Sequence, residues 1–285
     1  MSDLVSVYIP THNRRNFLER AIKSVQKQTY SNIELIIVDD GSSDDTWDYL
    51  SSIANENIKI FKHEKPLGAC VARNLAISHA KGKFVTGLDD DDEFLPERIA
   101  SLIKQYDSSY AFVCTGFLWN YGSKCRRVDA TAKVINLKEQ LSYNYATNQV
   151  LVERDRLLAI GGFDSEFVAC QDYDTWTRLI KEFGPAKRVE GALYVIHRDK
   201  GITRLTQSDN WLRGHSQFMA KHQKDMTDKN KTNQEFRRMI AQQQPLKLNV
   251  LYTQLKAGLM LQKSRYFLSS NLKFFAKIRR QILEK

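Results

Sequence analysis

The sequence has few of the residues that define disulfide-bonded, zinc-binding or fibrous proteins. It contains 4 Cys, 5 Pro and 13 Gly in 285 residues. The cysteines stand at positions 70, 114, 125 and 170, without the close pairs of a zinc site, and we expect them to remain thiols in a reducing compartment. The low Pro and Gly content excludes a collagen-like or low-complexity chain.

Long apolar runs are also missing. No stretch approaches the roughly 18 consecutive apolar residues of a membrane-spanning helix. The first residues, MSDLVSVYIPTHN, lack the basic start and the small-residue cleavage site of a secretory signal. We therefore expect a cytoplasmic protein. Its content of 42% hydrophobic and 27% charged residues is that of an ordinary folded chain.

Acidic residues are scarce in the C-terminal part alone. Residues 210–285 contain 16 Lys plus Arg against 4 Asp plus Glu, whereas residues 1–209 contain 27 against 29. We predict a near-neutral body, residues 1–209, followed by a basic helical extension, residues 210–285. The extension shows no nucleic-acid-binding motif, so we expect no nucleic-acid partner.

The end of this extension has the pattern of basic amphipathic helices. Such helices, with Leu and aromatic anchors, bind anionic membrane surfaces, which here would be the cytoplasmic face of an inner membrane. The same pattern also suits a helical face packed on the body, or a homodimer contact. The apolar positions are Leu251, Leu255, Leu259, Leu261, Phe267, Leu268, Leu272, Phe275 and Ile278, and the interleaved basic positions are Lys263, Arg265, Lys273, Lys277, Arg279 and Arg280.

Strand and helix patterns alternate over the first hundred residues. Residues 5–9, 35–38, 58–61 and 83–88 are predicted strands, and the continuous apolar run at 35–38 is typical of a strand buried on both faces of a parallel sheet. Apolar residues at helical spacing lie between them. Strands that alternate with helices imply right-handed crossovers and a parallel, doubly wound α/β sheet.

Polar side chains follow three of these four strands. Thr11 and Asn13 follow the first strand, Asp39 and Asp40 the second, and the tetrad Asp89–Asp92 the fourth. Because ligands bind outside the carboxyl ends of the strands in such sheets, we expect these groups to converge on one site.

The four adjacent carboxylates of the aspartate tetrad repel one another, and a bound cation or ligand would explain why they stand together. In an extended segment that leaves a strand, Asp89 and Asp91 would share one face, and Asp90 and Asp92 the other. One carboxylate could then hold Mg²⁺ or Mn²⁺ while its neighbour reaches a ribose hydroxyl. The alternative is a solvated acidic loop.

A helix is predicted over residues 171–183. Asp172 shares its inward stripe with Trp176, whereas Asp174 is spaced to pair with Arg178. The preceding Gly161-Gly-Phe-Asp164 has the composition of a turn.

Several motifs, taken together, resemble those of the family 2 glycosyltransferases, which have the GT-A fold. The likeness covers about residues 4–104 and resumes further along the chain. It implies a Rossmann-like, mostly parallel sheet flanked by helices, with a nucleotide-sugar-binding half (residues 1–104) and an acceptor-binding half (residues 105–209). The motifs are VSVYIPTHNRRNFLERAIKSVQKQTYSNIELIIVDDGSSDDT, GACVARNLAISHAKGKFVTGLDDDDEFLPERI, GGFDSEF and QDYDTWTRL.

The resemblance also implies roles for individual residues. Asp172 matches the general base. Asp89 and Asp91 match the two acids of the Asp-X-Asp motif, in which Asp91 is the ligand of a divalent cation, Mn²⁺ or Mg²⁺. His197 stands where many members have a histidine near the metal or the phosphates, although a histidine at a strand end needs no such role. The positions that match nucleotide-sugar-binding residues are Pro10, Thr11, Asn13, Asp39, Asp40, Arg73, Asp89 and Asp90.

The implied activity is the inverting transfer of a sugar from a nucleotide diphosphosugar to a glycan or a lipid-linked saccharide. The expected donor is a UDP-sugar, and the expected setting is the synthesis of a bacterial surface polysaccharide or lipopolysaccharide. Two positions depart from the family pattern: His12 replaces a tyrosine, and Gln171 replaces the glutamate of the acidic pair before the helix.

Two alternative functions remain open at the level of the sequence. Gln171 is the one feature that favours a non-catalytic scaffold that binds nucleotide sugars or a membrane. A sugar nucleotidyltransferase would have a similar sheet, but its glycine-rich first loop is missing.

Overall fold

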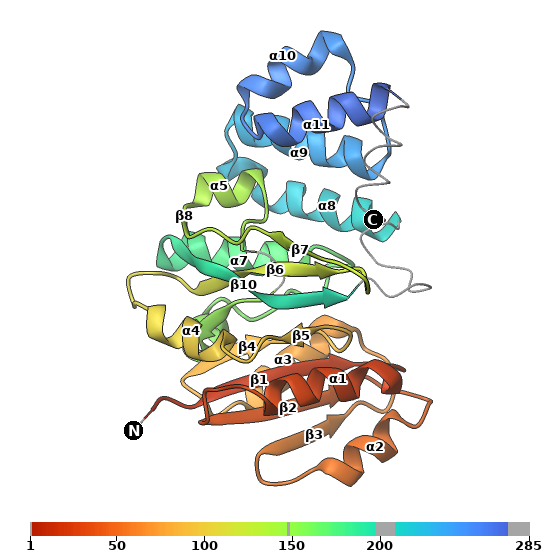
Figure 1. Ribbon diagram of the computed structural model, residues 1–285, viewed down its shortest axis with the longest axis vertical. Coiled ribbons are helices and arrows are strands. Elements are labelled where there is room, and N and C mark those ends of the chain that lie inside the picture. Colours follow the sequence, from red (N-terminus) through yellow and green to blue (C-terminus); the bar gives the residue numbers. More distant parts are fainter. Residues whose placement is uncertain (1, 147–148, 198–208, 273–285) are drawn as a thin grey trace. The chain divides into compact units, whose positions relative to one another are not determined.

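The computed structural model describes residues 2–146, 149–197 and 209–272 (Figure 1). The chain forms two compact units. The α/β unit comprises Met1–Leu137, Tyr145–Glu166 and Gln171–Ile202, and the helical unit comprises Lys138–Asn144, Phe167–Cys170 and Thr203–Lys285. The predicted tail positions Lys273, Phe275, Lys277, Ile278, Arg279 and Arg280 lie outside the described residues.

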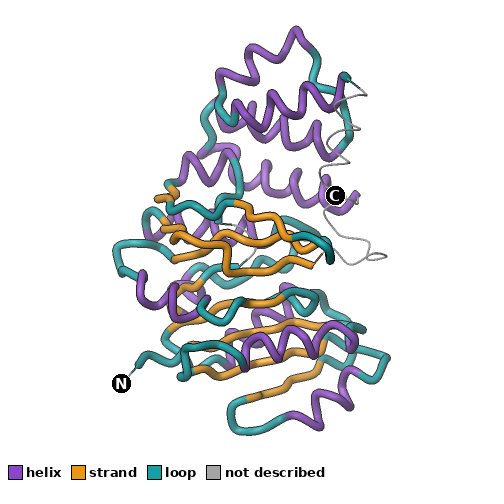
Figure 2. The backbone as a smooth tube through the Cα atoms, in the orientation of Figure 1, coloured by secondary structure: helices purple, strands orange, loops and turns teal. Residues whose placement is uncertain are grey.

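The α/β unit contains one mixed sheet, whose strands are orange in Figure 2. The predicted parallel strands are confirmed: β1 (Val5–Thr11) pairs with β2 (Ile33–Asp39) and with β4 (Phe84–Gly87), and β2 pairs with β3 (Ile58–Lys62). The strand order is β3-β2-β1-β4-β9-β6-β10-β5, and β9 runs antiparallel to β4 and β6. The other strands are β5 (Glu93–Phe94), β6 (Val113–Asn120), β7 (Cys125–Val128), β8 (Lys133–Ile135), β9 (Leu151–Glu153) and β10 (Ala186–His197).

Helices cover both faces of this sheet. Val7 and Ile9 of β1 pack in a core with residues of α1, α2 and α4, whereas Tyr8 of the same strand packs in a second core with residues of α3, α6 and α7. This division follows from the alternation of side chains along a strand. The helices are α1 (Arg15–Gln26), α2 (Thr46–Ile53), α3 (Ala69–His79), α4 (Arg98–Gln105), α6 (Arg154–Ala159) and α7 (Gln171–Phe183).

The helix α1 shows why these segments are helical. It buries Leu18, Ala21, Ile22 and Val25, the positions that the sequence places on one stripe. Full burial of an aliphatic side chain of this size stabilises the fold by about 1.5–3 kcal/mol. The packed stripe therefore holds α1 against the strand that ends at the candidate site.

Buried polar side chains hold the helical unit together. Nε2 of His215 lies 3.0 Å from Oε1 of Gln234, and Nε2 of Gln234 donates to the carbonyl of Leu141 at 2.6 Å. Burial lowers the pKa of His215.

None of the helices in the described part of the chain is long and apolar enough to cross a membrane. The elements of the helical unit are α5 (Leu137–Ser142), α8 (Asp209–His222), η2 (Gln223–Asp225), α9 (Asp228–Ala241), α10 (Leu248–Lys256) and α11 (Met260–Asn271).

The side chain of Lys263 does not lie on the basic outer face that the sequence pattern predicts. It is fully buried, and Nζ donates to Oδ1 of Asn233 at 2.6 Å and to the carbonyl of Gln254 at 2.5 Å. The prediction is wrong because α11 packs this side against α9 and α10. Burial lowers the pKa of Lys263 to about 8.

Candidate active site

The aspartate tetrad forms a turn and not an extended segment. The N–H of Asp92 donates to the carbonyl of Asp89 at 3.0 Å, so the chain turns between β4 and β5. The prediction that Asp89 and Asp91 share one face, with Asp90 and Asp92 on the other, is therefore wrong, because side chains alternate only along extended backbone. In the turn, the four carboxylates point toward different neighbouring segments.

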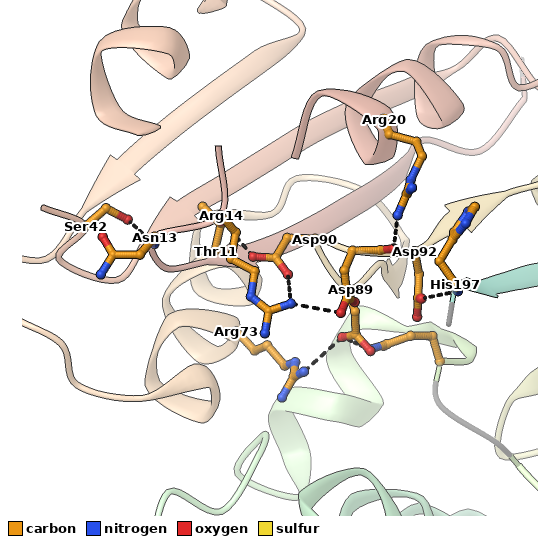
Figure 3. Close-up of polar contacts among 12 residues, drawn as sticks. Thr11, Asn13, Arg14, Arg20, Ser42, Arg73, Asp89, Asp90, Asp92 and His197 are labelled. Carbon is orange, nitrogen blue, oxygen red and sulfur yellow. Dashed lines mark hydrogen bonds and ion pairs between the residues drawn. The ribbon is translucent and has the colours of Figure 1, made fainter. Parts of the chain in front are cut away.

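All four carboxylates of the tetrad have polar partners, and Figure 3 labels Asp89, Asp90 and Asp92 with theirs. Adjacent carboxylates raise one another's pKa unless positive charges or hydrogen-bond donors offset the repulsion. Here donors come from β1, from the residue that precedes α1, from α3 and from the end of β10. Arg73 Nη2 lies 3.0 Å from Asp89 Oδ1, Thr11 Oγ1 donates to Asp90 Oδ2 at 2.8 Å, Arg14 Nη1 lies 2.9 Å from Asp91 Oδ2, and the N–H of His197 donates to Asp92 Oδ1 at 3.2 Å.

Asp90 has a buried side chain within the tetrad. Burial raises the pKa of this carboxyl to about 7, although the charge of Arg14 and the hydrogen bond from Thr11 act in the opposite direction. A carboxyl group with this pKa is partly protonated at neutral pH, so it can accept a hydrogen bond from a hydroxyl group or donate one to it.

Arg73, from α3, presents hydrogen-bond donors that lack acceptors. Its side chain is buried, and Nη2 pairs with Asp89, but Nε and Nη1 have no hydrogen-bond partner among the described residues. Burial lowers the pKa of Arg73, but the Asp89 carboxylate more than offsets this and the pKa is raised. Since an unsatisfied buried donor costs about 1–3 kcal/mol, an anionic ligand group would complete this guanidinium.

Gln149 is a site residue that the sequence analysis missed. Its buried side chain donates from Nε2 to Asp89 Oδ1 at 3.1 Å and accepts at Oε1 from the Tyr8 hydroxyl at 3.2 Å. Gly87 makes room for it, because a Cβ atom at Gly87 would lie 2.1 Å from Gln149 Oε1. No sequence signal marks this glutamine, since it belongs to an irregular segment before β9.

Tyr194 and Arg98 support the tetrad from the sheet side. The N–H of Asp89 donates to the Tyr194 hydroxyl at 3.2 Å, and the guanidinium of Arg98 lies 5.2 Å from the Tyr194 ring centroid. Arg98 Nη2 also donates to the carbonyl of Gln149 at 2.9 Å. Burial lowers the pKa of Arg98 to about 10, so it keeps its charge at neutral pH and offsets the negative charge of the turn.

Asp39 and Asp40, at the end of β2, make different contacts. Both carboxylate oxygens of Asp40 accept hydrogen bonds from the segment after β3: Oδ1 lies 2.7 Å from His63 Nδ1 and 2.9 Å from the N–H nitrogen of Leu67, and Oδ2 lies 2.7 Å from that of Gly68. Asp39 Oδ1 accepts a backbone N–H from the following turn at 2.9 Å, whereas Asp39 Oδ2 has no partner among the described residues. Asp40 therefore stabilises the loop that follows β3, whereas Oδ2 of Asp39 is available to accept a hydrogen bond from a ligand.

The end of β1 is fastened to the turn after β2. Asn13 has a positive φ of 52°, and its Oδ1 accepts the N–H of Ser43 at 2.8 Å. Pro10 is buried within β1, and His12 Nδ1 lies 2.8 Å from the backbone carbonyl that follows β2. Among these N-terminal site residues, Thr11 is the one with a contact to the tetrad, so the others shape the loops.

Asp172 lies in the first turn of α7, which begins at Gln171 as predicted. Burial raises the pKa of Asp172 to about 6, while the N–H of Tyr173 and the charge of Arg73 lower it and the charge of Asp89 raises it. The sequence leaves open whether the helix N-terminus or the nearby acids prevails, and burial decides the outcome. A carboxylate with this pKa is ionised at pH 7 and still basic enough to take up a proton.

Arg178 of α7 and Asn74 of α3 both hold the Gly161-Gly-Phe-Asp164 turn. The predicted pair is confirmed: Arg178 Nε lies 2.7 Å from Asp174 Oδ2, and Arg178 Nη2 donates to the carbonyl of Gly162 at 2.7 Å. Asn74 of α3 holds the same turn through both backbone groups of Phe163, at 2.7 and 2.8 Å. The turn thus links the helix that carries Arg73 to the helix that carries Asp172.

His197 ends β10 and contacts other polar groups beside the tetrad. Its Nε2 lies 2.6 Å from Glu93 Oε1, and its Nδ1 lies 3.3 Å from Asn120 Nδ2. These contacts involve both ring nitrogens. The role of His197 at a metal therefore stays a prediction.

The residues of the turn fit a cation that is shared with a substrate. Among the described residues no group of three or more His, Cys, Asp and Glu side chains could hold a metal ion. A nucleotide-bound Mg²⁺ or Mn²⁺ typically takes one or two protein carboxylates and fills its other positions with phosphate oxygens and water. Asp91, partly exposed and bound by Arg14, suits that arrangement better than a cage made by the protein alone.

The topology brings these groups to the carboxyl ends of parallel strands, where α/β enzymes bind nucleotides. The family described as "Glycosyl transferase family 2" matches residues 6–162, and the chain belongs to this family. It is therefore an enzyme of glycosyl transfer.

Two relatives by sequence come from Escherichia coli. The first, of strain K12, is named as a colanic acid biosynthesis glycosyl transferase, WcaA; it is 35% identical over 240 residues, which cover 79% of this chain and 83% of that protein. The second, WfgD, is named UDP-Glc:alpha-D-GlcNAc-diphosphoundecaprenol beta-1,3-glucosyltransferase; it is 32% identical over 181 residues, which cover 63% of this chain and 70% of that protein.

Solved structures share the fold. Residues 1–349 of TarS from S. aureus, in complex with UDP-GlcNAc, match with a TM-score of 0.64 and 17% identity over 95% of this chain and 82% of that one. The mannosyltransferase PcManGT from Pyrobaculum calidifontis, in complex with GDP-Man and Mn²⁺, matches with a TM-score of 0.57 and 17% identity over 77% and 65%. These likenesses confirm the GT-A fold.

Proposed function

We propose that this protein is an inverting, metal-dependent glycosyltransferase that moves a sugar from a UDP-sugar to a lipid-linked saccharide in surface polysaccharide synthesis. The observation that carries the proposal is Arg73, a buried guanidinium beside the aspartate turn, two of whose nitrogens have no hydrogen-bond partner among the residues that the structure describes. A diphosphate supplies the acceptor oxygens that these donors lack. The printed name of WfgD, with UDP-Glc and a diphosphoundecaprenol acceptor, supports the same donor and acceptor classes.

The nucleoside would bind along the ends of β1, β2 and β4. Asp39 Oδ2, which has no hydrogen-bond partner in the described part of the chain, could accept the ring N–H of a uracil base. Thr11 and Asp90 lie together at 2.8 Å and suit a ribose hydroxyl. Pro10, Asn13 and Asp40 would act by shaping the loops around the nucleoside.

Asp91 is the proposed ligand of the divalent cation, Mn²⁺ or Mg²⁺. Bound with the donor, the cation supplies positive charge where the leaving diphosphate develops negative charge. His197 remains the proposed second ligand, and it would have to exchange its contact with Glu93. The Mn²⁺ in the PcManGT complex supports a cation of this kind.

Asp172 is the proposed general base. It would take the proton from an acceptor hydroxyl while that oxygen attacks the anomeric carbon on the face opposite the leaving diphosphate, so the configuration inverts. The raised pKa of Asp172 suits proton uptake near neutral pH. Gln171, beside it, offers an amide in place of a second carboxylate and would affect acceptor contacts.

A lipid-linked acceptor would place the reaction at the cytoplasmic face of the inner membrane. The basic C-terminal helices are the proposed contact with that surface, with a homodimer contact as their alternative use.

Release of the nucleoside diphosphate (UDP, GDP or dTDP) from a panel of the corresponding nucleotide sugars, with Mn²⁺ and a polyprenyl-diphosphate-linked saccharide, tests the proposal. We expect release with a UDP-sugar only, and its loss in Asp91→Asn and Asp172→Asn. A protein that binds UDP but releases none with any acceptor would be the scaffold. Release of inorganic diphosphate from UTP and a sugar phosphate would identify a nucleotidyltransferase.

A further inference from the structure

The outer side of α10 and α11 carries a concentration of exposed apolar side chains. Eleven large apolar side chains are exposed in the described part of the chain, and eight of them lie between residues 240 and 272. The two helices pack side by side (Figure 1). The eight are Ile240, Leu248, Val250, Tyr252, Met260, Leu261, Leu268 and Leu272.

The apolar residues that are exposed on α10 and α11 differ in part from the apolar positions predicted from the sequence. Leu251 and Leu255 are not among the exposed residues, whereas Leu248 is 73% exposed and Tyr252 is 67% exposed, four residues apart on α10. On α11, Leu261 is 74% exposed. Spacings of four, and of seven and eleven from Leu261 to Leu268 and Leu272, put each set on one side of its helix.

Basic residues are interleaved with these apolar ones and no acidic residue accompanies them. Lys247, Lys256 and Arg265 are exposed, and the sequence has no Asp or Glu from residue 236 to residue 283. The Lys256 ammonium lies 4.3 Å from the centroid of the Tyr252 ring. We name the set Leu248, Tyr252, Lys256, Leu261, Arg265 and Leu268 the α10–α11 face.

Polar contacts on the inner side hold this face in one orientation. Lys263 is buried between Asn233 and the carbonyl of Gln254, and the Tyr266 hydroxyl donates to the carbonyl of Gln244 at 2.7 Å. Rotation of α11 would leave the buried ammonium of Lys263 without its acceptors, which is costly. The inner polar contacts therefore fix the orientation in which the apolar residues point outward.

We propose that the α10–α11 face is the surface on which the protein docks to an anionic lipid bilayer. Leucine and tyrosine side chains enter the interface, and lysine and arginine reach the negatively charged headgroups. A second copy of this chain is a poorer occupant, because a two-fold contact would bring basic faces together with no acidic residue to offset them. The inference rests on the membrane setting of the proposed function and names the face that makes the contact. Vesicles that contain neither donor nor acceptor test this docking separately from the transfer reaction.

Flotation of the full-length protein with vesicles of phosphatidylethanolamine and phosphatidylglycerol tests this proposal, with phosphatidylcholine vesicles for comparison. The apolar variant combines Leu248→Ser, Tyr252→Ser and Leu261→Ser, and the charge variant combines Lys247→Gln, Lys256→Gln and Arg265→Gln. Matched controls on other helices are Leu158→Ser, which removes a 44% exposed leucine, and Lys104→Gln, which removes an exposed lysine.

We expect the protein to float with anionic vesicles and not with phosphatidylcholine, and to be released by high salt. Each basic residue near an anionic surface contributes a factor of about five, so the charge variant should bind on the order of a hundredfold more weakly. The controls should bind as the parent does. Unchanged flotation of both variants, with circular dichroism that shows them folded, would overturn the proposal. So would a concentration-dependent dimer that the variants abolish while neither they nor the parent float.

Discussion

Gln149 and Arg73 share one oxygen of Asp89. Gln149 Nε2 donates to Asp89 Oδ1 at 3.1 Å, and Arg73 Nη2 approaches the same oxygen at 3.0 Å. The two donors come from segments 76 positions apart in the chain, so neither depends on local sequence to find the other. Together they leave the remaining donors of Arg73 available for a ligand.

Replacement of Gln149 by Met should lower transfer by more than its loss of stability explains. The change removes the donor to Asp89 and the acceptor for the buried Tyr8 hydroxyl, which costs about 1–3 kcal/mol. We expect kcat/KM for the donor to fall at least about tenfold, since Asp89 and Arg73 would no longer be held in register. Steady-state kinetics with thermal unfolding separates the two effects.

Gln28→Met is the matched control for this variant. Gln28 Nε2 donates to the carbonyl of Leu95 at 2.9 Å and Gln28 Oε1 accepts the N–H of Ile99 at 3.1 Å, so it loses comparable hydrogen bonds without a contact to Asp89. If both variants lost activity in proportion to their loss of stability, Gln149 would have no positioning role.

The pH dependence of transfer should report Asp172. Because burial raises its pKa to about 6, the base form predominates at pH 7 and is lost as the pH falls through about 6. This pKa belongs to the free protein, so it should appear in the pH profile of kcat/KM. We expect kcat/KM to fall about tenfold for each pH unit below 6, and Asp172→Asn to lower it by about 10²–10⁴ and to abolish this decrease at low pH. If activity still fell at low pH in Asp172→Asn, the titrating group would be another residue.

The same shift predicts a gain of stability in Asp172→Asn. The pKa of Asp172 is higher in the folded protein, about 6, than the ordinary value of 3.8, so stability falls as the pH rises between these values. At pH 7 the folded protein carries this cost, and its removal should raise the free energy of unfolding by on the order of 3 kcal/mol. Asp174→Asn should do the reverse, because it breaks the 2.7 Å pair with Arg178. Thermal melts at pH 7 compare the two.

The sequence could predict the fold and most of the strand-end residues because both follow from local patterns. The parallel strands and α7 came from continuous and periodic apolar residues, and Asp39, Asp40 and the tetrad came from their positions after strands. The turn at Asp89–Asp92 could not be predicted from alternation, since a hydrogen bond within the tetrad overrides it. Gln149 could not be found either, because its role depends on tertiary contacts to Asp89 and Tyr8.

Arg14→Gln should strengthen the binding of Mn²⁺ in the absence of donor. The guanidinium of Arg14 lies 2.9 Å from Asp91 Oδ2, so a cation must compete with it for that carboxylate. At a partly exposed site the competition is worth about 1 kcal/mol, which is about fivefold in the dissociation constant. Electron paramagnetic resonance of free Mn²⁺ measures this without turnover. Arg15→Gln, which removes a guanidinium paired with Glu19 instead, should leave the affinity unchanged, and equal shifts in both variants would mean that only net charge matters.

Asp39→Asn and Asp40→Asn should separate nucleotide recognition from loop stability. Asp40 accepts hydrogen bonds from His63, Leu67 and Gly68, so its replacement should lower the melting temperature, and its effect on UDP should follow from the loosened loop. Oδ2 of Asp39 has no hydrogen-bond partner among the described residues. In Asp39→Asn, the side-chain NH₂ would face the ring N–H of uracil in one orientation of the amide, so two donors would meet. In the other orientation the amide oxygen could still accept the hydrogen bond, but without the negative charge. We expect Asp39→Asn to weaken UDP binding about tenfold or more by calorimetry at nearly unchanged melting temperature, whereas binding of inorganic diphosphate should not change. If Asp40→Asn weakened UDP more than Asp39→Asn did, while both proteins remained folded, the contact with the base would belong to Asp40.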